Sequence, residues 1–269
     1  MGSTGFGAWR EVAAHTMATR WVLAGRFDGV PMLYHWRLLP HSPAALGPGA
    51  LDRWVAHWDG SPAVRARLTA GEPATTGVAL FMEHIPHTVD SWLAHAAAAG
   101  GRAADSAFTM VDRGLRAGSA FLESQGMRHF DAHFHNLLTD TNRVYFADFG
   151  LATSSRFDLG PDELVFFGQH ARYDRCYSVT HLSQWLVSNL LRMPWADARA
   201  HLRDRTDSGH PGDGFADLPG AAAGIVARHA PVAAIMIRFF AGLHDDSKST
   251  PFPAEELRRA LRRLGQCGG

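Results

Sequence analysis

Lysine and cysteine are almost missing from this chain of 269 residues, and each shortage excludes something. Lys248 is the only lysine, so nearly every mechanism that depends on a lysine amine is excluded. Cys176 and Cys267 are too few and too far apart to form a disulfide framework. A reducing, cytoplasmic location is therefore the expectation.

The chain also has no excess charge of either sign. Acidic and basic residues number 26 each, which argues against a nucleic-acid or membrane partner recognised through bulk charge. The N-terminus has no basic region followed by an apolar run, so no signal peptide is expected. The most apolar stretch, Leu218 to Leu243, is interrupted by Arg228, His229 and Arg238, which predicts a pair of core helices rather than a membrane span.

What the chain does contain is ample material for a core, with 46% apolar and 19% charged residues. The first third favours strands. Thr19 to Leu39 has two apolar runs around Asp28-Gly29, which predicts a hairpin, and the run "GVALFMEHI" from Gly77 predicts a buried strand. Leu51 to Leu68 has a helical pattern that Gly60-Ser61-Pro62 interrupts.

From Thr88 onward helical patterns dominate. Helices are predicted over Ala103 to Gln125, Cys176 to Leu191 and Pro253 to Gly265, and a loop over Arg203 to Gly220. The sequence therefore predicts a small strand-rich lobe followed by a larger helical lobe.

The most informative stretch is "RHFDAHFHNLLTDTNRVYFADFG", Arg128 to Gly150. A polar turn at Asp140-Thr141-Asn142 separates two apolar runs, and the resulting hairpin would return Asp148 to the side of Asn136 and Asp131. Carboxylate and amide oxygens suit magnesium, and a carboxylate left free can accept a proton from a hydroxyl.

The spacing His129-x-Asp131-x-x-x-x-Asn136, followed twelve residues later by Asp148-Phe149-Gly150, resembles the catalytic loop and metal-binding motif of the protein-kinase-like superfamily. This superfamily includes Ser/Thr kinases and aminoglycoside-type phosphotransferases. The resemblance extends from about Val78 to Leu190. It implies an α+β, bilobal fold with an N-terminal lobe over residues 1–82, a hinge over 83–88 and a helical C-terminal lobe over 89–269.

The resemblance also implies roles for individual residues in an ATP- and magnesium-dependent phosphotransferase. Asp131 would be the catalytic base, with His133 and Asn136 beside it, while Asn136 and Asp148 would hold magnesium against the phosphates of ATP. His129 would only pack the loop. Around the adenine of the ATP cofactor it implies four residues: Met82, Glu83, Ile85 and Leu138.

The acceptor stays open at this point. His133 stands where Ser/Thr kinases usually carry lysine and small-molecule phosphotransferases usually carry histidine. Leu151 to Gly168, with Thr153, Ser154 and Ser155, resembles an activation segment that receives a peptide. A Ser/Thr hydroxyl of a protein or peptide is therefore the expectation, and a small-molecule hydroxyl is the alternative.

The family binds phosphate with a strand lysine that pairs with a helix glutamate, but here no lysine precedes Lys248 and no glutamate lies between Glu11 and Glu72. Arg37, with His35 on the same strand face, is the positional substitute for the lysine, and Asp52 or Asp59 for the glutamate. "MGSTGFGAW" reads either as a loop that covers the phosphates or as a flexible terminus. The missing lysine also leaves open a pseudokinase, which would bind partners without turnover.

A zinc site is the competing interpretation of the same stretch. His129, Asp131, His133 and His135 alternate, and such a run can ligate zinc in a hydrolase if it is extended.

Overall fold

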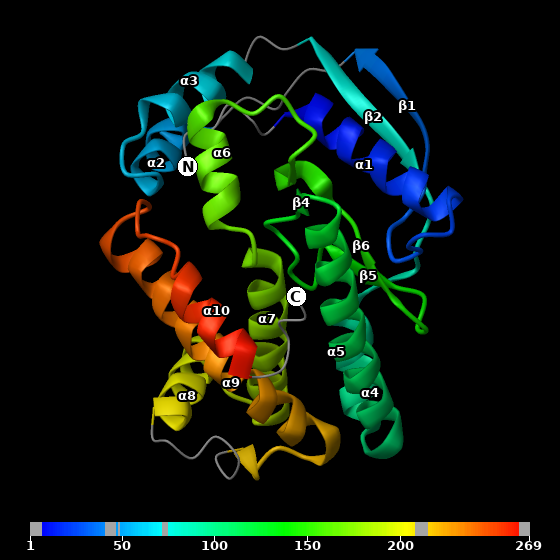
Figure 1. The fold of residues 1–269 in the computed structure, drawn as a ribbon, viewed down its shortest axis with the longest axis vertical. Coiled ribbons are helices and arrows are strands. Elements are labelled where there is room, and N and C mark those ends of the chain that lie inside the picture. Colours follow the sequence, from blue (N-terminus) through cyan, green and yellow to red (C-terminus); the bar gives the residue numbers. More distant parts are fainter. Residues whose placement is uncertain (1–6, 41–46, 48, 72–74, 208–214, 264–269) are drawn as a thin grey trace.

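The computed structural model describes residues 7–40, 47, 49–71, 75–207 and 215–263. It is an α+β fold, 62% helical, with three small antiparallel sheets. Figure 1 shows helices of the C-terminal half, α7 to α10, gathered below and a long two-stranded ribbon standing beside helix α1 above.

The N-terminal third is less strand-rich than expected. It contains helices α1 (Ala8–Leu23), α2 (Ala50–His57) and α3 (Pro62–Gly71), and strands β1 (Leu33–Pro40) and β2 (Thr76–Met82). The two strands pair antiparallel, with Leu33 opposite Met82 and Arg37 opposite Ala79. The strand over Gly77 to Met82 and the helix break at Gly60-Ser61-Pro62 are thus confirmed, but the expected burial of the strand is wrong. Its residues are half-buried or exposed, because β2 belongs to a sheet of only two strands.

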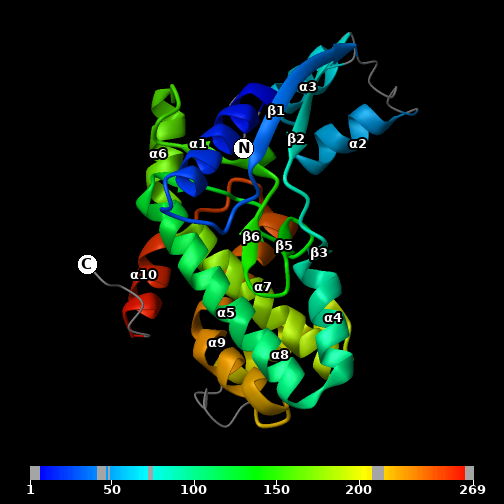
Figure 2. The ribbon, with the colours of Figure 1, turned by 90° about the vertical axis from the view of Figure 1, so that its right-hand side faces the viewer.

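The hairpin predicted over Thr19 to Leu39 is wrong. Its first apolar run is the end of α1, and only the second run is a strand. The reason lies in packing, because Ala14, Ala18 and Trp21 of α1 are buried in the same core cluster as the C-terminal helices. Figure 2 shows α1 running along the two-stranded sheet.

The helices predicted over Ala103 to Gln125, Cys176 to Leu191 and from Pro253 onward are confirmed in the described residues, and further elements that the sequence did not predict lie between them. Helices α4 (Val89–Ala99), α5 (Gly101–Ser124), α6 (Pro161–Gln169), α7 (Tyr173–Leu190), α8 (Trp195–Asp207) and α10 (Ala254–Arg263) surround the core. Strands β3 (His87–Thr88), β5 (Leu137–Thr139) and β6 (Val144–Phe146) form one sheet, and β4 (Met127–Arg128) pairs with β7 (Thr153–Ser154) in another. The predicted loop from Arg203 is helical as far as Asp207, and residues 208–214 lie outside the described part.

Two glycines inside α5 have a packing role. A Cβ on Gly114 would lie 2.8 Å from a methyl carbon of Val144, and one on Gly118 would collide with the ring of Phe146. Both glycines therefore let α5 approach β6 closely, which fixes the hairpin that carries the candidate site.

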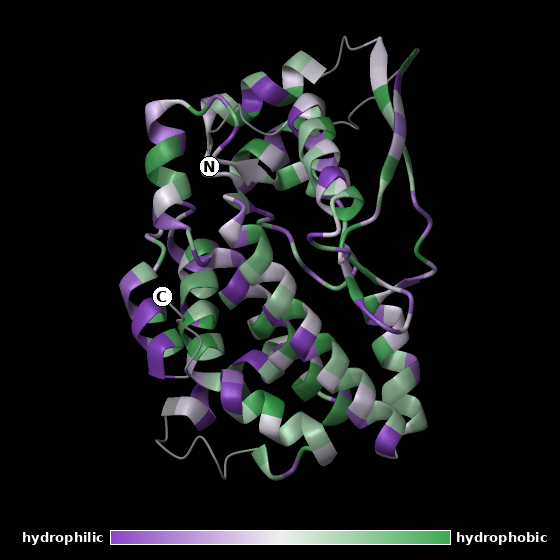
Figure 3. Ribbon diagram, turned by 45° about the vertical axis from the view of Figure 1, so that its right-hand side comes forward, coloured by the Kyte–Doolittle hydropathy of each residue, from purple (hydrophilic) through white to green (hydrophobic). Residues whose placement is uncertain are grey.

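The apolar stretch before the C-terminus forms one long helix rather than a pair. Helix α9 (Gly220–Ala241) continues through Pro231 and is followed by a π-helical turn, η3 (Gly242–Asp246). The span Gly220–Asp246 has the length and apolarity to cross a membrane, yet 61% of its most apolar window is buried inside the protein. Figure 3 shows hydrophobic residues in both the upper and the lower helices, while α10, next to the C-terminus, is largely hydrophilic.

The charges inside α9 have a partner on α5. Asp112, 3% exposed at its side chain, accepts from Nε2 of His229 at 2.6 Å and from Arg228 at 3.0 Å. Burial raises the pKa of Asp112, but the hydrogen bonds and charges of His229 and Arg116 outweigh it, so the pKa lies below its ordinary value. The stability from this carboxylate is therefore present above about pH 4 and is lost as the pH falls through the lower folded pKa.

Replacing Asp112 with Asn is expected to lower the free energy of unfolding by about 3 kcal/mol at pH 7, because it removes the buried carboxylate that the buried His229 faces. Urea unfolding at pH 7 and at pH 3 measures this, and the variant should lose less than the parent on acidification. Asp204→Asn, which removes an exposed partner of Arg203, is the control and should change little. Equal effects of the two substitutions would contradict the role given to Asp112.

Candidate functional site

The loop between β4 and β5 holds Asp131 and Asn136 against each other. Nδ2 of Asn136 donates to Oδ2 of Asp131 at 3.0 Å and to its carbonyl oxygen at 3.1 Å. Nε2 of His133 lies 3.7 Å from Oδ1 of Asp131, whose side chain is 33% exposed. Because the amide nitrogen of Asn136 is turned toward Asp131, its Oδ1 is the atom available to a metal ion.

The predicted hairpin is confirmed, and it brings Asp148 to this loop. Leu137 lies opposite Phe146, and the backbone N–H of Ala147 donates to the carbonyl of Asn136 at 3.1 Å. Asp148 follows with φ of 57°, a left-handed backbone that non-glycine residues seldom adopt. Its carboxylate is exposed and accepts from the N–H of Gly150 at 3.2 Å. The backbone pairing of Ala147 with Asn136 thus places Asp148 at the same end of the hairpin as Asn136 and Asp131.

A buried carboxylate that the sequence did not single out fixes the loop. Asp174, at the start of α7 and 3% exposed, accepts from the backbone N–H groups of His129 at 2.6 Å and Phe130 at 2.8 Å. Burial raises the pKa of Asp174, and the charge of His129 and these N–H donors oppose that effect. The sequence feature that could have revealed this role is the position of Asp174, an acidic residue at the start of the apolar helix α7. Phe130, held in this way, has φ of 65°, and such strain in a non-glycine residue is typical of functional sites.

His129 has the packing role that the resemblance implies. It is fully buried, its Nε2 lies 2.8 Å from the carbonyl of Ala147, and its Nδ1 accepts from the N–H of Asp131 at 3.3 Å. Both ring nitrogens are therefore occupied by the backbone on either side of the site. Within the described ranges, no group of three or more His, Cys, Asp or Glu side chains is arranged to hold a metal ion, which argues against the zinc interpretation.

A glutamate does reach the site, but from α1 rather than from the predicted positions. A Cβ built on Gly150 would lie 3.8 Å from Oε2 of Glu11. Burial raises the pKa of Glu11, and the charge of Asp148 adds to this. Asp52 instead pairs with Arg65 at 2.8 Å, and Asp59 accepts from the N–H of Lys248 at 2.8 Å. The helical form of Ala8–Leu23, which the sequence missed, is what brings Glu11 here.

The residues expected around adenine lie on β2, on the link from β2 to β3, and on β5. Met82 ends β2, and Ile85 is buried in the link to β3. Glu83 is fastened to Met32, donating from its N–H at 2.8 Å and accepting on its carboxylate at 3.1 Å. Leu138 is half-buried and lies opposite Thr88 and Tyr145. Adenine binding by these residues stays a prediction.

Arg37 lies exposed on β1, where its Nε donates to Nε2 of His35 at 2.9 Å. Trp36, on the opposite face of the strand, contacts Trp9 of α1 with ring centroids 5.5 Å apart. The structure thus pairs Arg37 with His35, and phosphate binding by Arg37 stays a prediction. Of the proposed phosphate-covering loop, residues 1–6 lie outside the described part, and Ala8 and Trp9 begin α1.

Only the start of the segment expected to receive a peptide is built into the fold, whereas most of Ser155 to Gly168 is exposed. Thr153 and Ser154 are buried in β7, opposite Arg128 and Met127 of β4. Further on, Glu163 of α6 forms an ion pair with Arg10 of α1 at 2.8 Å. The hydroxyls of Thr153 and Ser154 are therefore enclosed in the protein.

No protein-family model matches the sequence, and no curated protein matches it either. What can be said of function therefore rests on the site itself. The β4–β5 loop offers the partly exposed carboxylate of Asp131 and the amide oxygen of Asn136, and the exposed carboxylate of Asp148 follows β6. Such a set suits a hard cation and the abstraction of a proton from a hydroxyl.

Proposed function

We propose that this chain is a magnesium- and ATP-dependent phosphotransferase with a bilobal, protein-kinase-like arrangement. The observation that carries the proposal is the hydrogen bond from Asn136 to Asp131, next to the strand bond that brings Asp148 to the same end of the hairpin. Magnesium fits this donor set, since Oδ1 of Asn136 and the carboxylate of Asp148 are hard oxygen ligands. When bound, the ion would supply charge neutralisation for the phosphates of ATP.

The chain's own residues then divide the work. Asp131 orients the acceptor hydroxyl and takes its proton as the oxygen forms a bond to the γ-phosphorus, while the bond from that phosphorus to the β–γ bridging oxygen breaks and ADP leaves. Asn136 holds Asp131 in place through its amide nitrogen. His133, beside Asp131, is positioned to stabilise charge on the transferred group.

A pseudokinase is the second candidate, and one observation favours it. Nζ of the only lysine, Lys248, donates to the carbonyl of Leu243 at 2.7 Å, in the C-terminal part of the fold. The exposure of Asp131 and Asp148 favours the enzyme, because a binding module has no need of a proton acceptor beside a metal site.

Calorimetry with ATP, with and without magnesium, tests the proposal. The expected result is ATP binding that magnesium strengthens at least tenfold, which is about 1.4 kcal/mol.

The role of Arg37 is tested in the same assay. If Arg37 neutralises phosphate charge, Arg37→Ala weakens ATP binding about tenfold and Arg37→Lys is tolerated. Arg65→Ala, at another exposed arginine, is the matched control. A protein that binds no nucleotide would overturn the proposal, and an unaffected Arg37→Ala variant would remove Arg37 from it.

A further inference from the structure

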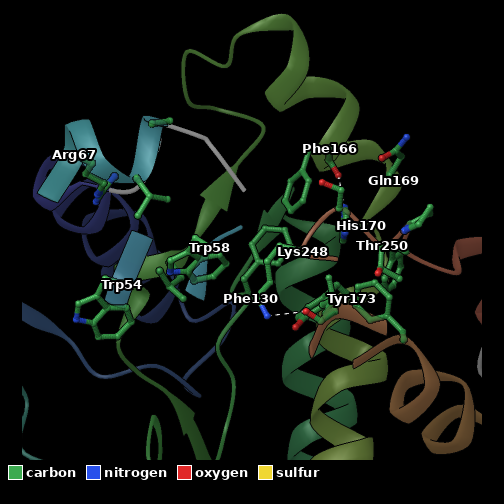
Figure 4. A pocket seen from close by; sticks show the side chains of 18 of the residues that line it. Trp54, Trp58, Arg67, Phe130, Phe166, Gln169, His170, Tyr173, Lys248 and Thr250 are labelled. Carbon is green, nitrogen blue, oxygen red and sulfur yellow. Dashed lines mark hydrogen bonds between the residues drawn. The ribbon is translucent and has the colours of Figure 1, made fainter. Parts of the chain in front are cut away.

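An apolar pocket of about 560 Å³ opens next to the candidate site. Figure 4 shows Trp54 of α2 and Trp58, which directly follows α2, on one side, Phe166, His170 and Tyr173 on the other, and Phe130 between them. Pockets of about 300–1,000 Å³ with such linings are typical binding sites for small molecules. The metal and nucleotide roles proposed above leave this pocket unused.

Two residues that line the pocket belong to the chain segments that carry Asp131 and Asp148. Phe130 precedes Asp131 directly, and Leu151 follows Asp148 by three residues. Burial raises the pKa of Tyr173 well above its ordinary value, and among the nearby groups that add to this is the charge of Asp131. A ligand in the pocket would therefore lie against the residues that flank both carboxylates.

The aromatic side chains of the pocket are held in place by contacts with one another. His170 stacks on Phe166 and on Phe252, with ring centroids 3.9 and 4.7 Å apart, and Phe130 packs against Tyr173 at 5.2 Å. The opposite wall is fastened to this one, because Asp59, between α2 and α3, accepts from the N–H of Lys248 at 2.8 Å and from the hydroxyl of Ser247 at 3.3 Å. Trp54 is nevertheless 50% exposed, a large apolar surface that a ligand would cover.

The charged residues that line the pocket indicate which ligand charge it favours. Arg67 and Lys248 line the pocket, and none of its described lining residues is Asp or Glu. A polycationic amine would meet like charge here, whereas a neutral or anionic ring compound meets aromatic faces and a cationic rim.

We infer that this pocket binds the phosphate acceptor, and that the acceptor is a small hydroxylated ring compound, neutral or anionic, rather than a peptide or a cationic sugar. The inference rests on the proposed function for the transfer itself: the acceptor O–H loses its proton to Asp131, the oxygen bonds to the γ-phosphorus of ATP, and ADP departs. The volume of the pocket, about 560 Å³, supports a small molecule, because it lies within the range typical of small-molecule sites and is too small for an extended peptide.

Binding to the pocket can be measured without nucleotide. We expect 6-hydroxy-2-naphthoate and 2-naphthol to bind in calorimetry, and kanamycin, a polycation, to bind at least tenfold more weakly. Trp58→Ala and Ala63→Trp, which open and fill the pocket respectively, should each weaken naphthoate binding at least tenfold. Arg67→Gln should weaken naphthoate more than naphthol. Trp9→Ala is the matched control, because Trp9 is 59% exposed and does not line the pocket.

The transfer step is then measured with γ-labelled ATP and magnesium. Label should appear on 6-hydroxy-2-naphthoate in the parent and at least tenfold more slowly in Ala63→Trp. The pocket assignment is overturned if neither naphthalene compound binds, or if Trp58→Ala and Ala63→Trp leave the affinity for naphthoate unchanged. If naphthoate binds in the pocket but does not slow phosphoryl transfer to a peptide, the pocket is not the acceptor site, although it remains a binding site. A protein that binds naphthoate but no ATP would instead contradict the proposed function.

Discussion

Asp131→Asn is expected to abolish phosphoryl transfer while leaving the affinity for magnesium-bound ATP close to that of the parent. The carboxylate meets the acceptor hydroxyl, so its loss removes the proton acceptor and not a phosphate ligand. The substituted amide oxygen can still accept from Nδ2 of Asn136, as Oδ2 does at 3.0 Å, and the loop should keep its form. Removal of a general base costs about a hundredfold or more, which corresponds to at least about 2.7 kcal/mol in the barrier.

The measurement is the rate at which γ-labelled ATP transfers its terminal phosphate to 6-hydroxy-2-naphthoate or to water, beside the dissociation constant for nucleotide. Asp158→Asn, which removes an exposed carboxylate of equal charge, is the control. A folded Asp131→Asn protein that no longer binds ATP would identify Asp131 as a nucleotide or metal residue instead.

Asp148→Ala is expected to remove the dependence of ATP binding on magnesium and with it all turnover. Asp148 is the exposed carboxylate at the end of the hairpin, and Oδ1 of Asn136 alone is too weak a ligand to hold the ion. Affinity for ATP in the presence of magnesium should fall to the value without it, a change of at least tenfold, or about 1.4 kcal/mol. Calorimetry at matched magnesium concentrations measures the change.

Asp148→Asn separates charge from geometry in the same assay. It keeps an oxygen that can accept from the N–H of Gly150, as Oδ1 does at 3.2 Å, but it removes the negative charge. Its magnesium dependence should lie between those of the parent and Asp148→Ala. Unchanged nucleotide binding in the alanine variant would show that the metal assignment is wrong.

The sequence predicted the parts of the fold that local chemistry determines. The turn at Asp140-Thr141-Asn142 sets the β5–β6 hairpin, where Oδ1 of Asp140 accepts from the N–H of Asn142 at 2.9 Å. The helical period and the break at Gly60-Ser61-Pro62 likewise depend on neighbouring residues alone. Because the hairpin is set by its own turn, local sequence is enough to predict that Asp148 returns to the side of Asn136.

What the sequence missed depends on contacts between distant segments. The apolar run that ends α1 reads as a strand by itself, and only its packing against the C-terminal core makes it a helix. The charges at Arg228 and His229 suggested a break in α9, but Asp112 neutralises them from another helix. Asp174 and the pocket were missed for the same reason, because their partners come from segments far apart in the chain.

Paramagnetic broadening by manganese tests most directly whether the hairpin end is the metal–nucleotide site. Mn²⁺ replaces Mg²⁺ with ATP in a sample labelled with ¹⁵N, and amide signals close to the ion disappear. A metal site at this end of the hairpin predicts loss of the signals from Asn136 and from Ala147 to Gly150 with Mn²⁺ and ATP together, and their retention in the Asp148→Ala protein. Broadening centred elsewhere, or equal broadening in Asp148→Ala, would show that the ion binds at another place.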